Sequence, residues 1–567
     1  MDQDKSAFIE QLIDKMTLEQ KVGQCLVIGF VGTVITPEIL KRIRQYYPAG
    51  VRAGLTFRVK TAVHDPTSVG HDKYAARVVR HPKGTVKDYL PGLRVPHCTN
   101  EEYCAFTNRL KQAALDNGLG IPLHITMDME GDTSADYIRG GIHYFPSPMA
   151  YSLGNAPHLA REVAWAIGRQ LRPVGCDWLH SPVLDVNTHP LNPEIGTRSY
   201  GEDPETAAAY ALEALKGYQA AGIITTGKHF PGRGASVTDA HSEMPVIDIP
   251  RAEMQNHLRP FQQLIDAGIP AIMTAHTAYP SLDPSGLPAT LSKRILTDLL
   301  KGEMGFKGTI TTDDITMGGI IQKYEVPEAC RLALEAGADL VLVRDESPLI
   351  DEVVAGLIQA VQQGRLQEER LNDAIRRTLS VKYDYGLFEQ GSIRAVSQAS
   401  DGIRDPKVVE IATQAAQCGV RVLKDTQKLL PLKPDQRVLL IEQINPLHRN
   451  TNSQACHPGI LWENLLNISD QVAMVETNLQ LTGQDYERIQ HRLNEADIII
   501  ATDYYYRNQA KDERYGQELL KLGKPVIVVT NTHYPTAVRP EYETVVVSYG
   551  VGPESMTAIA RTLYGIG

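Results

Sequence analysis

The side chains best suited to proton transfer lie in one short segment, residues 228–241. Lys228 and His229 open it, and Asp239 and His241, separated by one residue, close it. A carboxylate beside an imidazole fixes the tautomer of the imidazole and stabilises its imidazolium form, which suits proton transfer near neutral pH. Two glycines and several small residues give the segment the freedom to move that catalytic lids need. The alternative is a loop in which Asp239 and His241 only cap a turn, and the neighbouring Lys-His pair weighs against it.

Further titratable side chains follow short apolar runs elsewhere in the chain. Five such runs carry, at their end or directly after it, groups that can hold charge or a proton, and these groups are Asp128, Glu130, Lys228, His229, His276, Asp313, Asp314, Arg344 and Asp345. In a barrel of parallel strands, catalytic groups come from the carboxyl ends of the strands and from the loops that follow them. Because so many titratable groups lie at the carboxyl ends of the predicted strands, we expect them to form one shared site.

The elements that must position these groups are eight apolar, β-branched runs in the first two thirds of the chain. They cover residues 26–30, 50–57, 123–130, 178–186, 223–230, 271–276, 309–314 and 340–344. Strands buried on both faces are continuous hydrophobic runs, and the segments between these runs carry the 3.6-residue apolar period of helices. Eight alternating units predict an α/β fold of the TIM-type (β/α)8 barrel class. An open doubly wound sheet is the alternative.

A second α/β domain is predicted after the barrel. We assign residues 1–388 to the barrel, 389–405 to a polar linker and 406–567 to a C-terminal parallel-sheet sandwich. Five more strand-like runs support the last assignment: 437–444, 471–477, 496–503, 525–530 and 543–548. The glycine cluster Gly550-Val551-Gly552 lacks the third glycine of a dinucleotide-binding loop, so we expect no nucleotide site and no cofactor.

Longer motifs give the chain a specific resemblance. Residues 228–241, followed by Met244-Pro245, resemble the signature loop of glycoside hydrolase family 3 in its β-N-acetylhexosaminidase branch. Matching pieces occur in the family's order at residues 181–187, 192–201, 273–276 and 305–317, and residues 422–424 and 429–432 resemble the start of its second domain. The likeness covers nearly the whole chain. It implies a retaining, exo-acting β-glycosidase, most directly a β-N-acetylhexosaminidase that releases terminal GlcNAc.

The resemblance also implies roles, position by position. Asp313 matches the nucleophilic aspartate, which forms a glycosyl-aspartate in a double displacement, and His241 matches the acid/base histidine with Asp239 as its polarising partner. The residues that match those holding the terminal sugar are Asp128, Arg198, Lys228 and His229. A charged contact from Arg198 and Lys228 would orient the sugar and keep Asp313 ionised. No metal ligand is implied.

Three segments depart from the family pattern. After Glu130 the usual Glu-Gly-Gly-Arg is replaced by a longer segment, in which we assign Arg139 to the arginine's place in substrate binding. Residues 52–97 form an insertion with nine Lys and Arg against three Asp, which could contact an anionic aglycone or a partner subunit; a solvated loop is the alternative. Its four histidines lack metal-ligand spacing. Arg233 stands where many relatives carry a histidine, a change that we treat as neutral.

Composition limits the function classes. The 567 residues carry a formal net charge of −10, with 43% hydrophobic and 22% charged residues, which is typical of a globular protein and argues against a nucleic-acid binder. No apolar run approaches the roughly 18–20 residues that span a bilayer, so no membrane partner is expected. Seven cysteines without a CxxC pair are expected to be reduced and structural. The amphipathic N-terminal pattern, in place of a signal-peptide core, favours the cytoplasm.

Several functions stay open as alternatives. Within the family these are an exo-β-glycosidase for another sugar and a glycoside phosphorylase, because a histidine acid/base adds no negative charge against phosphate. In a different class, a metal-dependent amidohydrolase on the same barrel would use His229, His276 and Asp345, but it needs a His-x-His at the end of the first run, which is absent there. A sugar-binding protein without catalysis is disfavoured by the complete set of acidic and histidine groups. The expected partner is a carbohydrate, and the linkage, the aglycone and the oligomeric state, a homodimer included, stay open.

Overall fold

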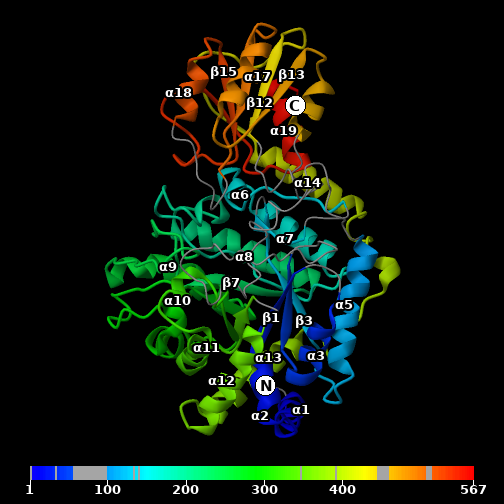
Figure 1. Cartoon of the computed structure of the whole chain (residues 1–567), viewed down its shortest axis with the longest axis vertical. Helices are drawn as coiled ribbons and strands as arrows, with labels where there is room; N and C mark the ends of the chain where they lie inside the picture. Colours follow the sequence, from blue (N-terminus) through cyan, green and yellow to red (C-terminus); the bar gives the residue numbers. More distant parts are fainter. Residues whose placement is uncertain are drawn as a thin grey trace.

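The computed structural model describes residues 3–31, 35–54, 99–131, 134–137, 141–344, 348–389, 392–443, 459–505 and 514–566. They form two lobes, a larger one drawn in blue to green and a smaller one drawn in yellow to red (Figure 1). The predicted basic insertion, residues 52–97, lies outside the described residues from residue 55 onward.

Eight parallel strands of the larger lobe close into a barrel. In sheet order they are β10 (Val341–Val343), β1 (Leu26–Val31), β2 (Gly50–Gly54), β3 (His124–Met127), β6 (Trp178–Leu179), β7 (Ile224–Phe230), β8 (Ala271–Thr274) and β9 (Thr309–Thr312). A parallel bridge joins Thr311 to Leu340 directly before β10, and Thr312 N donates to Leu340 O at 2.9 Å. The predicted TIM-type barrel is confirmed, and the open-sheet alternative is wrong.

The barrel has a packed interior. Strands β3, β7, β8 and β9 are buried along their whole length. Such strands need apolar side chains on both faces, because helices cover one face and barrel side chains fill the other. Side chains from five strands pack in one cluster: Val27, Trp178, Ile224, Ala271 and Leu342. This core holds the carboxyl ends of the strands in fixed positions, and with them the predicted site residues that lie on or directly after those ends.

Helices surround the strands. They are α1 (Gln3–Asp14), α2 (Leu18–Gln24), α3 (Pro37–Tyr46), α5 (Asn100–Leu115), α7 (Pro157–Leu171), α8 (Pro204–Ala221), α9 (Arg251–Asp266), the π-helix η4 (Arg294–Glu303), α11 (Val326–Ala336), α12 (Leu349–Gln362) and α13 (Glu368–Asp384). Asp203 caps α8 by accepting from Thr206 N at 3.0 Å, Pro204 begins the helix, and Gly222 ends it with a φ of 69°. Since β7 starts two residues later, this helix end sets where the strand that carries Lys228 begins.

The smaller lobe contains a six-stranded sheet. Its order is β11 (Arg421–Asp425), β16 (Thr544–Val547), β15 (Val526–Thr530), β14 (Ile498–Thr502), β12 (Val438–Gln443) and β13 (Val472–Thr477). Helices α14 (Pro406–Gly419), α16 (Ile460–Leu466), α17 (Gly483–Leu493), α18 (Tyr515–Leu520) and α19 (Pro553–Leu563) accompany it. Two separate apolar clusters involve this sheet, as expected of a sheet covered on both faces. The five predicted runs all form strands.

Two strands of the structure, β11 and β6, differ from the prediction. β11 was not expected as a strand; it pairs antiparallel with β16, and most of its side chains are exposed, so it has no continuous apolar run. The run at 178–186 yields only the two residues of β6. Pro182 has no N–H to donate to a ladder. The segment nevertheless continues beside β7, since Leu184 N donates to Lys228 O at 2.6 Å.

The two lobes touch at the barrel end that carries the predicted site. Tyr505, three residues after β14, donates its hydroxyl to Pro193 O at 2.6 Å. Ser147 N donates to Tyr549 O at 2.7 Å, and His143 Nδ1 lies 2.6 Å from Glu554 Oε1. The carboxyl ends of the second sheet therefore face the carboxyl ends of the barrel strands.

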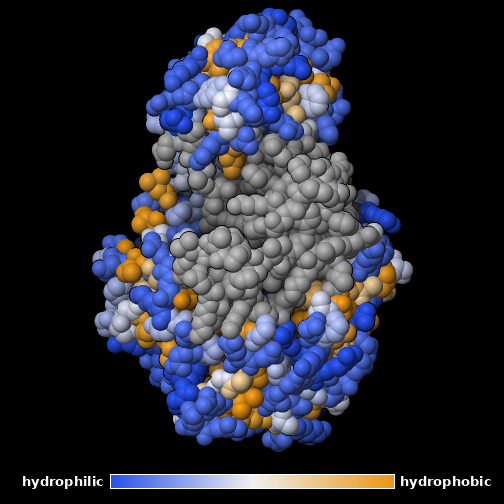
Figure 2. Space-filling model, viewed as in Figure 1, coloured by the Kyte–Doolittle hydropathy of each residue, from blue (hydrophilic) through white to orange (hydrophobic). Residues whose placement is uncertain are grey.

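Where Figure 2 colours the surface, both lobes are mostly hydrophilic, with hydrophobic residues in small separate spots. None of the helices in the described ranges is long and apolar enough to cross a membrane.

Candidate active site

Asp313 lies directly after β9, at the carboxyl end of the barrel. Its carboxylate is 18% exposed, and Oδ2 lies 3.8 Å from His229 Nε2 and 3.9 Å from Arg233 Nη1. Burial raises the pKa of this carboxyl, whereas His276, Arg233 and nearby cationic groups lower it, and the net pKa is below its usual value. An ionised carboxylate that still meets solvent can act as a nucleophile.

The neighbouring Asp314 is placed differently. Its Oδ1 accepts from Thr316 Oγ1 at 2.7 Å, from Thr316 N at 3.1 Å and from Arg344 N at 3.2 Å. These bonds stabilise the turn after β9, and they occupy Oδ1 of Asp314 as a hydrogen-bond acceptor. Asp313 accepts one backbone bond, from Asp314 N to Oδ1 at 2.8 Å, and the choice of Asp313 as the nucleophile stays a prediction.

Asp239 and His241 form the predicted hydrogen-bonded pair. His241 Nδ1 lies 2.7 Å from Asp239 Oδ1, and the backbone N–H of His241 donates to the same oxygen at 2.8 Å. Asp239 thus caps a local turn as well as holding the ring, and the role of the pair in proton transfer stays a prediction. With Nδ1–H bound to a carboxylate, Nε2 is the ring atom that can exchange a proton. The His241 side chain is 38% exposed, which leaves it open to a substrate.

A second carboxylate meets the same ring nitrogen. Glu194 Oε1 lies 3.2 Å from His241 Nδ1, and its other partner is the guanidinium of Arg233. Sequence reasoning assigns no role to Glu194 and treats Arg233 as a neutral change, although both residues lie within the motifs that carry the resemblance. A carboxylate inside an otherwise apolar and turn-forming segment was the signal that could have pointed to Glu194.

Three of the predicted sugar-binding residues, Asp128, Arg198 and Lys228, meet in one ionic network with Glu130. Lys228 Nζ lies 2.7 Å from Asp128 Oδ1 and 2.5 Å from Glu130 Oε1. Arg198 holds Glu130 with two parallel hydrogen bonds, Nε to Oε2 at 2.7 Å and Nη2 to Oε1 at 2.9 Å. Arg52 joins the network by pairing with Asp128. Arg198 thus binds Glu130, and Lys228 is among the cationic groups that lower the pKa of Asp313.

This network keeps its carboxylates charged. Burial raises the pKa of Glu130, but Arg198 and Lys228 lower it to about 2. Asp128 is affected in the same way: burial raises its pKa, and Lys228 and Arg52 lower it well below its ordinary value. Fixed carboxylates and their cations can accept and donate hydrogen bonds to several hydroxyls of a sugar.

His229 is held in one orientation by a buried acid. Its Nδ1 donates to Asp185 Oδ2 at 2.7 Å, and Arg233 N donates to Asp185 Oδ1 at 2.6 Å. His229 Nε2 is then the atom that faces Asp313. Other residues of this end that were not predicted for the site are Arg52, Asp136, His180 and Asp185, of which Asp185 lies within a motif noted above.

The histidines do not match the amidohydrolase arrangement. His276 uses both ring nitrogens, Nδ1 with Thr290 Oγ1 at 2.8 Å and Nε2 with Asp314 O at 2.9 Å. Within the described ranges, a metal could be held by Glu194, Asp239 and His241, whose ligand atoms lie within 4.8 Å of one another. Their hydrogen bonds and the Arg233 pair already satisfy these groups. Arg139 and Asp345 lie outside the described residues.

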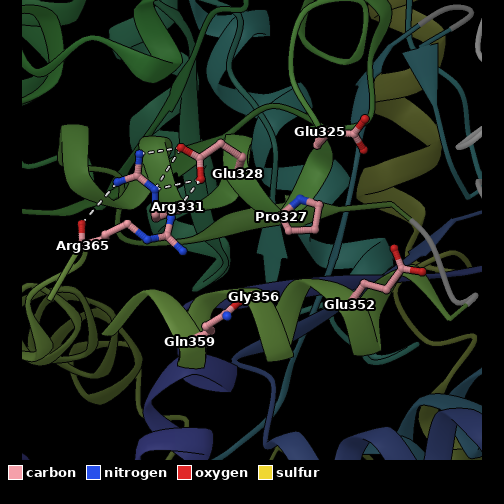
Figure 3. A pocket seen from close by; sticks show the side chains of 8 residues that line it. All are labelled: Glu325, Pro327, Glu328, Arg331, Glu352, Gly356, Gln359 and Arg365. Atoms are coloured by element: carbon pink, nitrogen blue, oxygen red, sulfur yellow. Dashed lines mark hydrogen bonds and ion pairs between the residues drawn. The ribbon is translucent and has the colours of Figure 1, made fainter. Parts of the chain in front are cut away.

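A separate hollow lies in the outer layer of the barrel, between α11 and α12 (Figure 3). Its volume is about 270 Å³, and it is lined by Glu325, Pro327, Glu328, Arg331, Glu352, Gly356, Gln359 and Arg365. Arg331 is already paired with Glu328, Nη2 to Oε1 at 2.6 Å. None of the predicted site residues that the structure describes lines this hollow.

Known proteins resemble the chain along most of its length. Residues 94–381 match the family model described as the glycosyl hydrolase family 3 N terminal domain. Beta-hexosaminidase A of Pseudoalteromonas piscicida is 29% identical over 418 residues, which cover 70% of this chain and 67% of that protein. A beta-hexosaminidase of Nitrosomonas eutropha is 33% identical over 261 residues, 44% of this chain and 73% of that protein. A solved glycoside hydrolase family 3 beta-N-acetylglucosaminidase from a Paenibacillus species has a TM-score of 0.82 and 26% identity, covering 97% of each chain.

Proposed function

The chain belongs to glycoside hydrolase family 3, and we propose that it is a retaining, exo-acting β-N-acetylhexosaminidase that releases terminal GlcNAc. The observation that carries the proposal is the pairing of an ionised Asp313 after β9 with the Asp239–His241 dyad at the same end of the barrel. A retaining glycosidase needs these two functions, a nucleophile and a proton donor, on either side of the anomeric carbon. The beta-hexosaminidase and beta-N-acetylglucosaminidase names of the relatives support the choice of sugar.

The first half-reaction forms a glycosyl-aspartate. An oxygen of Asp313 attacks the anomeric carbon while His241 Nε2 gives its proton to the glycosidic oxygen. The bond from the anomeric carbon to the leaving oxygen breaks, and a bond to the Asp313 oxygen forms. Asp239 stabilises the imidazolium before transfer and keeps Nδ1 occupied, so the proton moves only through Nε2.

The second half-reaction hydrolyses this ester. His241 Nε2 takes a proton from a water molecule, whose oxygen attacks the anomeric carbon and displaces the Asp313 carboxylate. Lys228, Arg198, Asp128 and His229 hold the sugar during both steps through its hydroxyls. Their mutual ion pairs fix these side chains before the substrate arrives, which lowers the entropy cost of orienting it.

A panel of nitrophenyl β-glycosides tests the proposed activity. GlcNAc, glucose, xylose and mannose derivatives are compared by kcat/KM, with the Asp313→Asn variant as the background control. We expect the GlcNAc derivative to be the best substrate and the variant to be inactive on all four. A higher kcat/KM for another sugar would replace the sugar in this proposal, and sugar 1-phosphate formed with added phosphate would favour the phosphorylase alternative.

A further inference from the structure

Glu194 and Arg233 form a buried ion pair between the two proposed catalytic groups. Each side chain is 1% exposed, and the Arg233 Nη2 group contacts Glu194 Oε1. The same Glu194 oxygen lies 3.2 Å from His241 Nδ1, and Arg233 Nη1 lies 3.9 Å from Asp313 Oδ2. One pair therefore reaches both the proposed acid/base group and the proposed nucleophile.

The pair is anchored to the barrel. Asn192 Oδ1 accepts from Glu194 N at 2.9 Å, and Asn192 Nδ2 donates to Arg233 O at 2.9 Å. Arg233 N donates to the buried Asp185 at 2.6 Å. These bonds fix the backbone of both residues, so the carboxylate and the guanidinium hold defined positions.

Glu194 and Asp239 hold His241 in different ways. Asp239 is two residues away on the same loop, so it sets the ring's orientation relative to that loop. Glu194 comes from the segment between β6 and α8, so it sets the ring's position relative to the barrel. It also accepts from the loop backbone, Ala240 N to Oε2 at 3.4 Å. The Glu194 contact therefore ties the ring directly to the barrel, in addition to the backbone bonds by which Gly318 N donates to His241 O at 3.2 Å and Gly319 N to Ala240 O at 3.0 Å.

Two N–H groups of Arg233 remain for hydrogen bonding on the side of the site where Asp313 lies. Its Nε and Nη1 groups have no hydrogen-bond acceptor among the described residues, although the side chain is buried. A buried donor without an acceptor is costly, and active sites are where such groups occur. The positive charge of Arg233 also favours the ionised form of Asp313.

We propose that Glu194 and Arg233 are a positioning pair that sets His241 and Asp313 relative to each other. Glu194 docks the acid/base histidine on the barrel, and Arg233 holds Glu194 while it stabilises the nucleophile's charge. The inference rests on the proposed function, because it needs His241 to be the acid/base group. Arg233, where many relatives carry a histidine, is then not a neutral change, because it pairs with Glu194 and lies 3.9 Å from Asp313.

A buried ion pair can also be purely structural. Breaking such a pair strands one charge and destabilises a protein, whereas neutralising both partners is often tolerated. The double variant Glu194→Gln/Arg233→Gln removes both charges together, and Glu194→Gln removes one. A structural role predicts that the double variant regains the activity that the single variant loses, while a positioning role predicts that it does not.

The experiment measures kcat/KM on aryl glycosides with good and poor leaving groups, with thermal unfolding as the folding control. For Glu194→Gln we expect kcat/KM to fall about 10- to 100-fold with the poor leaving group and little with the activated one. The expected loss is smaller than the whole contribution of general acid catalysis, because His241 itself is retained. The double variant should show the same pattern or a stronger one at a normal unfolding temperature. Recovery to wild-type activity in the double variant would overturn the proposal. If the double variant does not fold, Arg233→Lys and Arg233→Gln are compared instead. Arg233→Lys keeps the positive charge and should lose less activity than Arg233→Gln. Equal losses in the two variants would overturn the proposal.

A pH profile gives a readout that a structural role would not move. The charged groups around His241 are Asp239 on its own loop, Glu194, and Asp313 after β9, with Arg233 behind them. Removing the Glu194 charge disfavours the imidazolium, so the alkaline limb of kcat/KM should move to lower pH in Glu194→Gln. An unchanged limb would contradict the positioning role. The His241→Ala variant distinguishes failure of the proposed function from failure of the positioning pair. If its loss of activity is the same for good and poor leaving groups, the proposed function is refuted. If its loss depends on the leaving group but the loss in Glu194→Gln does not, only the positioning role of Glu194 and Arg233 is refuted.

Discussion

Replacing Asp239 with alanine should weaken proton transfer by His241 and leave the nucleophile intact. Asp239 Oδ1 accepts from the ring Nδ1 at 2.7 Å and from the backbone N–H at 2.8 Å. The change removes the carboxylate that stabilises the imidazolium but keeps the imidazole. Asp313 lies after another strand and keeps its own neighbours, His229 and Arg233.

The size of the effect follows from these contacts. A hydrogen bond to a charged group contributes about 1.5–3 kcal/mol, which corresponds to a change of about 10- to 150-fold in a rate constant. Two features favour the lower end: the His241 side chain is 38% exposed, and Glu194 Oε1 at 3.2 Å still accepts from Nδ1. We therefore expect about a tenfold loss in the steps that need protonation of the leaving group.

The assay is kcat/KM for a series of aryl glycosides of the preferred sugar, plotted against the pKa of the released phenol. The poorest leaving group should show the tenfold loss, and the most activated one almost none, because it leaves without a proton. Asp239→Asn is the matched control, since its amide oxygen can still accept from Nδ1, and it should lose less. An equal loss across the series would refute the reasoning and assign Asp239 to loop structure alone.

Three further results are expected. Asp313→Asn should unfold at the wild-type temperature but lose several orders of magnitude in turnover, because an amide cannot form the glycosyl ester; substantial residual activity would point to another nucleophile. Treatment with EDTA should leave kcat unchanged, and activity that returns only with added zinc would support the amidohydrolase alternative. The contact of His143 with Glu554 raises the pKa of His143, so its contribution to stability is complete below the ordinary histidine pKa of about 6.5 and is lost as the pH rises through the raised value. The difference in unfolding temperature between wild type and His143→Gln should therefore be larger at pH 5.5 than at pH 8.5, and a constant difference would contradict this linkage.

The strands could be predicted where burial dictates composition. All eight barrel runs and the five later runs are apolar because both faces of these strands are covered, and each contains a strand of the structure. β11 has no such constraint, since its edge position leaves most of its side chains exposed. β6 is shorter than its run because hydrogen bonding near Pro182 is irregular, which an apolar pattern does not reveal.

The site was predictable where its partners are close in sequence. Asp239 and His241 are two residues apart, so their hydrogen bond follows from spacing alone. The partners of Arg198 and of Glu194 come from other segments of the barrel end, Glu130 on β4 and Arg233 in the loop after β7, at separations of 68 and 39 residues. Sequence spacing carries no information on which acid meets which arginine across the barrel end, and only the closed fold brings them together.

Trapping of the covalent intermediate tests the central claim most directly. A 5-fluoro glycosyl fluoride of the preferred sugar slows both half-reactions, but its fluoride leaves readily, so the glycosyl-enzyme should accumulate. Mass spectrometry of the digested protein should then find the sugar on the peptide that contains Asp313, attached to that residue. A label on Asp314, or turnover without any labelled peptide, would contradict the proposed mechanism.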